Sequence, residues 1–125
     1  MKTLNNFING KSVPATSGKT SDLINPATGQ VFAKAPISSA TDVDSAMNAA
    51  AKAFEDFRDS TPSERQKALL KIADAIESRA DELVALESEN TGKPLAVTTS
   101  EEIPPMLDQI RFFAGAARNL EGRSA

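Results

Sequence analysis

The stretch TPSERQKALLKIADAIESRADELVALESENTGKP, residues 61–94, contains clear signals for a helix start. Thr61 and Glu64 have the spacing of a capping box, in which each side chain bonds the backbone N–H of the other residue. Pro62 suits the first position of a helix, where no backbone donor is needed. Apolar residues then recur at helical spacing, namely Leu69, Ile72, Ile76, Ala80 and Leu83. The stretch therefore predicts a helix that begins near residue 61 and buries one apolar stripe.

The same stretch indicates where this helix is interrupted and where it ends. Ser78-Arg79 marks a position at which the helix can break. Gly92 suits the left-handed conformation that closes a helix, and Pro94 cannot continue one. Thr91-Gly92-Lys93-Pro94 has two interpretations: a helix C-cap with Lys93 near the negative end of the helix dipole, or an anion-binding nest. The local residues favour the cap.

Another helix is predicted before this stretch, starting near Thr41. Its apolar residues form one stripe with spacings of four and three residues: Val43, Met47, Ala50, Phe54 and Phe57. We expect Phe54 and Phe57 to lie in the core.

A further helix is predicted after Pro104-Pro105, and Gly122 is expected to end it. Its predicted buried face has helical spacing and comprises Ile103, Met106, Ile110, Phe113, Ala117 and Leu120. Phe112 lies on a different face and would be buried only by another layer of protein. Phe112 and the Ala-rich side of residues 114–117 are therefore expected to be exposed in a monomer, which favours self-association.

Before the helices, turn residues separate short apolar stretches, which indicates strands. Residues 7–13 predict a hairpin whose turn at Asn9-Gly10 provides the positive φ angles that a tight turn requires. Residues 22–25 and 30–35 predict two more strands, joined by a turn that contains Pro26 and Gly29. These strands form a small β meander, which has too few strands to be stable alone.

The predicted fold is therefore α+β: a small N-terminal β meander followed by three or four amphipathic helices. We place the meander, packed on the helices, in residues 1–38 and the helical part in residues 39–125. A chain of 125 residues has room for one domain, and together the two parts are expected to form one incomplete domain.

One short motif is similar to the end of a phosphate-binding P-loop, namely Ser17-Gly18-Lys19-Thr20. The complete motif has Gly five residues before Gly18, where this chain has Val13, and it is followed by a helix. A strand is predicted to follow here, so we interpret the motif as a turn.

Composition excludes several classes of function. The net charge of −3 does not favour a nucleic-acid partner. The chain has no Cys and no His, which excludes Ser-His-Asp and Cys-His catalysis within it and nearly excludes a zinc site. The N-terminus lacks the apolar core of a signal peptide, and no apolar run approaches the length of a membrane span. We therefore expect a soluble, cytoplasmic protein without a membrane partner.

Three acidic residues, Glu101, Glu102 and Asp108, surround the start of the last predicted helix. Two carboxylates can perform acid–base chemistry where burial separates their pKa values. Alternatively, acidic residues near a helix N-terminus are stabilised by the helix dipole and remain solvated. Local physics favours the second interpretation, and an independent small enzyme that uses only carboxylates is a weak third hypothesis for the chain.

Four segments, in order and with matching spacing, resemble the N-terminal part of the NAD(P)-dependent aldehyde dehydrogenase superfamily. They are FINGK (7–11), INPATGQV (24–31), TGKPL (91–95) and RFFAGAAR (111–118). The resemblance covers residues 5–122. The combination of Glu102-Ile103-Pro104-Pro105 with residues 111–118 is most similar to bacterial γ-aminobutyraldehyde dehydrogenases, which implies oxidation of an aminoaldehyde to the acid.

The resemblance also implies what this chain does not contain. In the family, a nucleophilic Cys, a general-base Glu and a Rossmann-like domain for NAD or NADP follow the segment matched here. Because the chain has no Cys, we expect it to be inactive alone, with no catalytic residue and no cofactor-binding residue of its own. We expect it to associate with the remainder of a dehydrogenase or with itself, as a homo-oligomer. The alternative is a non-catalytic helical interaction or oligomerisation module.

A few site roles are implied by position in the family. The backbone carbonyl of Ile24 and the side chain of Asn90 correspond to ligands of a structural monovalent cation, although relatives have Asp at the position of Asn90. A second set corresponds to residues that line the substrate entrance, namely Glu101, Glu102, Pro105, Asp108 and Phe112. In relatives that oxidise aminoaldehydes, acidic residues there attract the ammonium group of the substrate.

Overall fold

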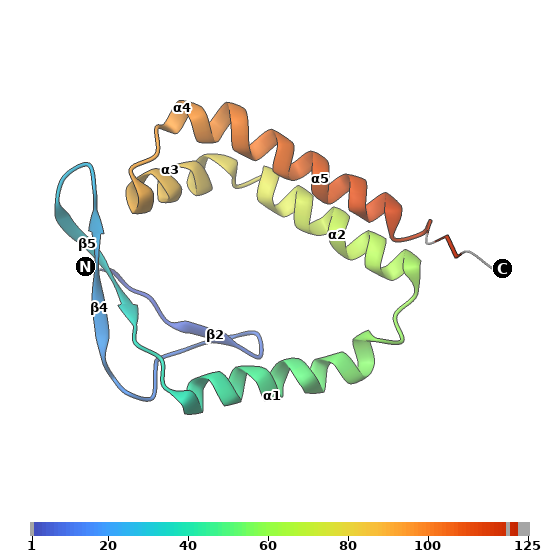
Figure 1. Ribbon diagram of the computed structural model, residues 1–125, viewed down its shortest axis with the longest axis horizontal. Coiled ribbons are helices and arrows are strands. Elements are labelled where there is room, and N and C mark those ends of the chain that lie inside the picture. The colour runs from blue at the N-terminus through green and yellow to red at the C-terminus, as the bar shows by residue number, and fades with distance from the viewer. Residues whose placement is uncertain (1, 120, 123–125) are drawn as a thin grey trace. The chain divides into compact units, whose positions relative to one another are not determined.

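The computed structural model describes residues 2–119 and 121–122 (Figure 1). The chain divides into two compact units, Met1–Asp59 and Ser60–Ala125, which we call unit 1 and unit 2 and describe separately. Strands end at Pro36 and helices begin at Ala40, which is close to the predicted change at residue 38. The α+β fold of short strands followed by helices is confirmed. That residues 1–38 and 39–125 form one incomplete domain stays a prediction.

Unit 1 begins with five short strands: β1 (Lys2–Thr3), β2 (Asn6–Ile8), β3 (Lys11–Val13), β4 (Thr20–Asn25) and β5 (Gln30–Pro36). The predicted hairpin is β2–β3, and its turn residues Asn9 and Gly10 have φ angles of 52° and 74°. The strands form two sheets rather than one continuous meander, since β2–β3 stands apart from the sheet β1-β5-β4. In the three-stranded sheet, β1 pairs in parallel with the edge of β5 that β4 leaves free.

The turn interpretation of Ser17-Gly18-Lys19-Thr20 is confirmed. The backbone N–H of Gly18 donates to the carbonyl of Ala15 at 3.0 Å, and Gly18 has a φ angle of 65°. Strand β4 begins at Thr20, so the helix that a P-loop requires is not there.

Helix α1 (Ala40–Phe57) completes unit 1. Ser39 caps it, and a capping box joins Ser39 to Asp42. The expectation that Phe54 and Phe57 lie in the core is wrong, because the two side chains are 60% and 55% exposed. The predicted stripe along α1 is exposed at Val43 and Met47 as well. Short strands supply too few apolar side chains to cover a helix of 18 residues.

Asp42 is a buried carboxylate that joins the start of α1 to the turn before β4. It accepts hydrogen bonds from the backbone N–H of Ser39 at 2.7 Å and of Thr16 at 3.0 Å. The Thr16 hydroxyl donates to the same carboxylate at 3.1 Å. The Ser39 N–H, followed by the Thr16 N–H and the two hydroxyls, holds the pKa of Asp42 below its usual value.

We therefore predict that acid destabilises the chain through Asp42. Since the folded-state pKa is depressed, this carboxylate contributes stability that is present above the unfolded value of about 4 and lost as pH falls through the folded value. Asp42→Asn should lower the melting temperature at about pH 7 and make it less dependent on pH below about 5. Thermal melts across this range would measure the effect. Asp44→Asn, at an exposed position of the same helix, should keep the parent profile, and an identical profile for Asp42→Asn would contradict the prediction.

Unit 2 contains α2 (Pro62–Glu77), α3 (Ala80–Thr91), the short α4 (Leu95–Val97), a π-helical segment η1 (Thr98–Glu102) and α5 (Ile103–Ala116). Helices α2 and α5 lie side by side and run in opposite directions (Figure 1). The predicted capping box of Thr61 and Glu64 is confirmed, as is the break at residues 78–79. Gly92 closes α3 with a φ angle of 75°, which confirms the C-cap interpretation.

The core of unit 2 lies between α2, α3 and α5. Its buried members are Ala73, Val84, Ile103 and Leu107, with Ile76, Ala80 and Ile110 packed against them. Ala73 of α2 is fully buried in this cluster. This core places α5 and the segment before it on a packed support.

The predicted buried face of α5 requires correction. Ile103 is buried and Ile110 is half-buried, but Met106 and Phe113 are exposed, while the buried residues Leu107 and Ala114 were not predicted. Phe112 is 68% exposed, as expected. On the Ala-rich side of residues 114–117, Ala114 is buried, which contradicts the expected exposure at this residue, whereas Ala116 is exposed as expected. Helix α5 ends at Ala116 rather than near Gly122, Ala117 is half-buried, and Leu120 lies outside the described residues.

Candidate functional site

The candidate site is a pocket of 620 Å³ in unit 2, with a mostly apolar lining that also carries two carboxylates. Helices α2, α3 and α5 and the segment η1 supply its lining residues: Ile76, Leu83, Glu87, Thr98, Glu102, Ile103 and Met106. Thr98 and Glu102 are the first and last residues of η1. The π-helical segment therefore places both of its ends at the same pocket.

Lys93 joins the two carboxylates of this pocket. Its Nζ donates to Glu87 Oε1 at 3.1 Å and to Glu102 Oε1 at 2.6 Å. The three side chains are 32–41% exposed, so water reaches them only in part. The hydrogen bonds to Glu102 and then to Glu87 raise the pKa of Lys93 above its usual value. The ammonium therefore stays charged and engaged at neutral pH.

Thr98 contributes a buried polar atom to the same lining. Thr98 is 3% exposed, and its hydroxyl oxygen has no hydrogen-bond partner among the residues that the structure describes. A buried hydroxyl without a partner carries a desolvation cost that a hydrogen bond from a ligand or water would remove. The pocket therefore combines apolar walls with one unsatisfied polar group.

The five residues predicted at a substrate entrance occupy different surroundings. Glu102 lines the pocket, whereas Glu101 is exposed and accepts a hydrogen bond from the Ser100 hydroxyl at 3.2 Å. Pro105 and Asp108 are exposed on α5. Phe112 packs edge-to-face on Phe113, with ring centroids 5.3 Å apart. Of the five, Glu102 alone lines the pocket, and the entrance role of all five stays a prediction.

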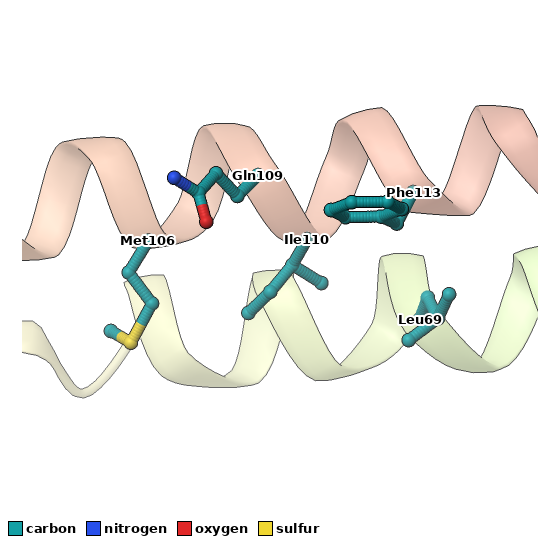
Figure 2. A pocket seen from close by; sticks show the side chains of 5 residues that line it. All are labelled: Leu69, Met106, Gln109, Ile110 and Phe113. Carbon is teal, nitrogen blue, oxygen red and sulfur yellow. The ribbon is translucent and has the colours of Figure 1, made fainter.

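A second, open pocket of 470 Å³ lies between α2 and α5. Figure 2 shows Met106 and Ile110 of α5 reaching toward α2, with Leu69 on the α2 side and Phe113 further along α5. Gln109 is its polar member. The exposed side chains of Met106 and Phe113 border this pocket, which makes it an uncovered part of an apolar surface.

The predicted monovalent-cation ligands lie in different units. Ile24 lies in β4 next to a register shift between Leu23 and Ile24, and Asn90 is exposed near the end of α3. A shift of this kind disrupts strand pairing locally, and the last carbonyls of a helix carry negative partial charge. The shared cation site stays a prediction. In the described part of the chain, no group of three or more acidic residues is arranged to hold a metal ion.

Reasoning from the sequence missed Glu87, Lys93 and Thr98. Lys93 was interpreted as a charge near a helix end, which gives no reason to connect it with Glu102. The left-handed Gly92 directs the chain away from the α3 axis, and the Lys93 side chain then contacts Glu87 on α3 and Glu102 on η1. The signal that could have found the cluster is one basic residue close in sequence to several acidic ones.

Comparisons with known proteins identify the family of this chain. The profile described as the aldehyde dehydrogenase family matches residues 13–125. A long-chain-aldehyde dehydrogenase of Acinetobacter sp is 40% identical over 117 residues, which cover 94% of this chain and 23% of that protein.

Solved structures extend the similarity to the fold. The NAD-dependent aldehyde dehydrogenase of Sinorhizobium meliloti has a TM-score of 0.90 and 38% identity, over 98% of this chain and 25% of that one. The γ-glutamyl-γ-aminobutyraldehyde dehydrogenase of Burkholderia cenocepacia has a TM-score of 0.92 and 33% identity, over 98% and 25%. The fold is therefore that of the N-terminal quarter of an NAD-dependent class of oxidoreductases. The chain belongs to the aldehyde dehydrogenase family, and it spans about a quarter of the length of these relatives.

No helix in residues 2–119 has both the length and the apolar character needed to cross a membrane.

Proposed function

We propose that this chain acts as the N-terminal segment of an NAD(P)-dependent dehydrogenase that oxidises aminoaldehydes, such as 4-aminobutyraldehyde, to the acid. The segment η1 supports the aminoaldehyde preference, because it carries Glu101 and Glu102 directly before α5. A carboxylate that faces a cation in partly desolvated surroundings attracts it. The Burkholderia relative named for a γ-aminobutyraldehyde derivative is consistent with this preference.

The observation that carries the proposal is the uncovered apolar surface of the helices. Met47 and Phe54 on α1 are 65% and 60% exposed, and Phe112 on α5 is exposed to a similar degree. Large exposed apolar side chains of this kind indicate a surface that another protein layer covers. We propose that the remainder of the dehydrogenase, or a further copy of the chain in a homo-oligomer, covers these faces in the cytoplasm. The proposal includes no nucleic-acid and no membrane partner.

In this proposal, the reaction takes place in the remainder of the dehydrogenase and not in this chain. The chain supplies packing surface and the acidic η1 segment, whereas NAD or NADP and the reacting aldehyde carbon bind to the remainder. We therefore expect no oxidation of aldehydes and no cofactor binding by the chain alone.

One observation favours a second candidate, a non-catalytic module that pairs helices. The α1 stripe has alternating spacings of four and three residues from Val43 to Phe57, which is the seam of a helix pair. The same stripe would then hold two copies of the chain together without any enzyme.

Complementation distinguishes the two candidates. The chain would be mixed with a form of the Sinorhizobium aldehyde dehydrogenase that lacks the matching quarter, and NAD reduction would be followed with 4-aminobutyraldehyde and with butyraldehyde. We expect activity only when both pieces are present. Restored activity would support the dehydrogenase segment. An oligomeric chain that restores nothing would favour the helical module, and NAD reduction by the chain alone would overturn both.

In the complemented enzyme, Glu102→Gln tests the substrate class. We expect the KM for 4-aminobutyraldehyde to rise about fivefold, because the variant loses one partly exposed ion pair between the carboxylate and the substrate ammonium group. The KM for butyraldehyde should not change, because this substrate has no ammonium group. If Glu102→Gln changes the KM for both aldehydes by the same factor, the proposed preference for aminoaldehydes is contradicted.

A further inference from the structure

Two carboxylates from separate elements converge on one ammonium group in unit 2. Glu87 lies on α3 and Glu102 ends η1, yet one oxygen of each lies within 3.1 Å of Lys93 Nζ. Lys93 follows the left-handed Gly92, so the backbone delivers this side chain from outside both elements. The arrangement is that of an ammonium ion bound by a carboxylate pair, with the ion tethered to the chain.

The charge of the cluster is incompletely balanced. Two carboxylates and one ammonium leave a net charge of −1 at the pocket. Without Lys93, two like charges would share a partly buried site beside apolar walls, which is unfavourable for both. The two carboxylates therefore favour a bound cation, and the Lys93 ammonium neutralises one of their two negative charges.

The Thr98 hydroxyl is an independent sign that the pocket is incomplete. Thr98 belongs to the lining and is almost fully buried, and within the described part of the chain its hydroxyl has no hydrogen-bond partner. A ligand with an N–H donor and an apolar body matches this lining, in which Ile76, Leu83 and Met106 are apolar and the Thr98 oxygen lacks a donor. Primary alkylammonium ions have this combination.

We propose that Lys93 is the internal occupant of an ammonium site formed by Glu87 and Glu102, and that Lys93 sets the specificity of the pocket by competing with external primary ammonium ions. Lys93 is thus a positioning residue: while its ammonium pairs with Glu102, this carboxylate attracts a ligand cation less strongly. The link from ammonium ions to aminoaldehydes rests on the proposed function, whereas the occupancy of the carboxylate pair by Lys93 does not.

Reactivity of the lysines in the intact chain tests the occupancy. Reductive methylation requires a free, neutral amine, so Lys93 should react more slowly than Lys71, an exposed residue of α2, in the same sample. Glu102→Gln should accelerate modification of Lys93 about fivefold and leave Lys71 unchanged, as measured by peptide mass spectrometry. Equal rates for Lys93 and Lys71 in the parent chain would overturn the proposal.

Binding of n-butylammonium to the intact chain tests the competition. We expect Lys93→Met to lower the Kd about fivefold or more, because the ion no longer displaces a tethered ammonium. Lys93→Arg keeps the positive charge, and Lys71→Met changes a residue away from the pocket. Both variants should therefore have the Kd of the parent chain for n-butylammonium. Titration calorimetry at two salt concentrations would measure the change, and a Lys93→Met variant that binds no tighter than Lys71→Met would refute the competition.

These measurements separate the inference from the proposed function. Both use the chain without any aldehyde or NAD, so failed complementation leaves their outcome intact. If Lys93→Met disrupts folding, the methylation rates of the parent chain and of Glu102→Gln still decide whether Lys93 occupies the carboxylate pair, and Glu102→Gln should then bind n-butylammonium more weakly than the parent chain. Conversely, the chain could bind n-butylammonium tightly while Glu102→Gln leaves the KM of the complemented enzyme for 4-aminobutyraldehyde unchanged. This outcome would support the ammonium site and count against an aminoaldehyde as the substrate.

Discussion

Leu107→Ala is expected to destabilise unit 2 by about 2–5 kcal/mol, the range found for truncating a buried Leu. Leu107 is 6% exposed and belongs to the core cluster with Ala73, Val84 and Ile103. Truncation removes the contacts of Leu107 with this cluster and leaves a cavity among its side chains. A loss of this size is a large part of the stability of a small domain. Urea denaturation followed by circular dichroism would measure the change.

Leu95→Ala provides the matched control, since it deletes the same atoms at a position in α4 that is 54% exposed. We expect this variant to lose less than about 1 kcal/mol. Equal losses in the two variants would mean that Leu107 does not anchor α5. The double variant would then show whether the two positions act independently.

The double variant Met47→Glu/Phe54→Glu is expected to weaken self-association of the chain by more than about tenfold. Burial of one large apolar side chain contributes about 1.5–3 kcal/mol, and each protomer would lose two of them while placing charges in the interface. Folding of unit 1 should change little, because these side chains are mostly exposed already. Sedimentation velocity over a range of concentrations would measure the association.

Ser45→Glu/Asn48→Glu adds the same charge to exposed positions of α1 that are not part of the stripe. If general repulsion controls association, this pair of substitutions will weaken it as strongly as the first pair. If the apolar stripe is the contact surface, association of the control will stay close to that of the parent chain. If Met47→Glu/Phe54→Glu self-associates as strongly as the parent chain, the stripe is not the contact surface.

Features that depend on neighbouring residues were predictable from the sequence. The capping box of Thr61 and Glu64, the turn at Asn9-Gly10 and the left-handed Gly92 all form as expected. In each case the residue type itself satisfies a backbone donor or permits a positive φ angle. Such signals act over three or four residues and need no tertiary contact.

The buried face of α5 was not predictable in the same way. Met106, Leu107, Ile110, Phe113 and Ala114 give the helix two adjacent apolar stripes, each with helical spacing. Periodicity alone cannot choose between them. Packing on the other helices decides which stripe is buried, because Leu107 joins the cluster of Ala73 and Val84, residues far from it in the sequence.

The candidate site was predictable only in part. Resemblance to a family indicated Glu102 through its position, without indicating which groups surround it. The contacts of Glu102 depend on the path of the backbone after Gly92 and on the side chain of Lys93. Apolar side chains predicted as core, such as Phe54, were misplaced for another reason, because a periodic stripe does not reveal whether other residues of the chain cover it.

The π turn at residues 98–102 also has a consequence for how this family can change length. A π turn contains one residue more than the α turn it replaces, and here the Ile103 N–H reaches back five residues to the Thr98 carbonyl. Loss of a single codon within this segment would leave an ordinary α turn, and α5 would still present Leu107 to α2. The same loss inside α5 would rotate the residues beyond it by about 100°. Alignment gaps of one residue should therefore collect at positions 98–102 and be rare in positions 104–113.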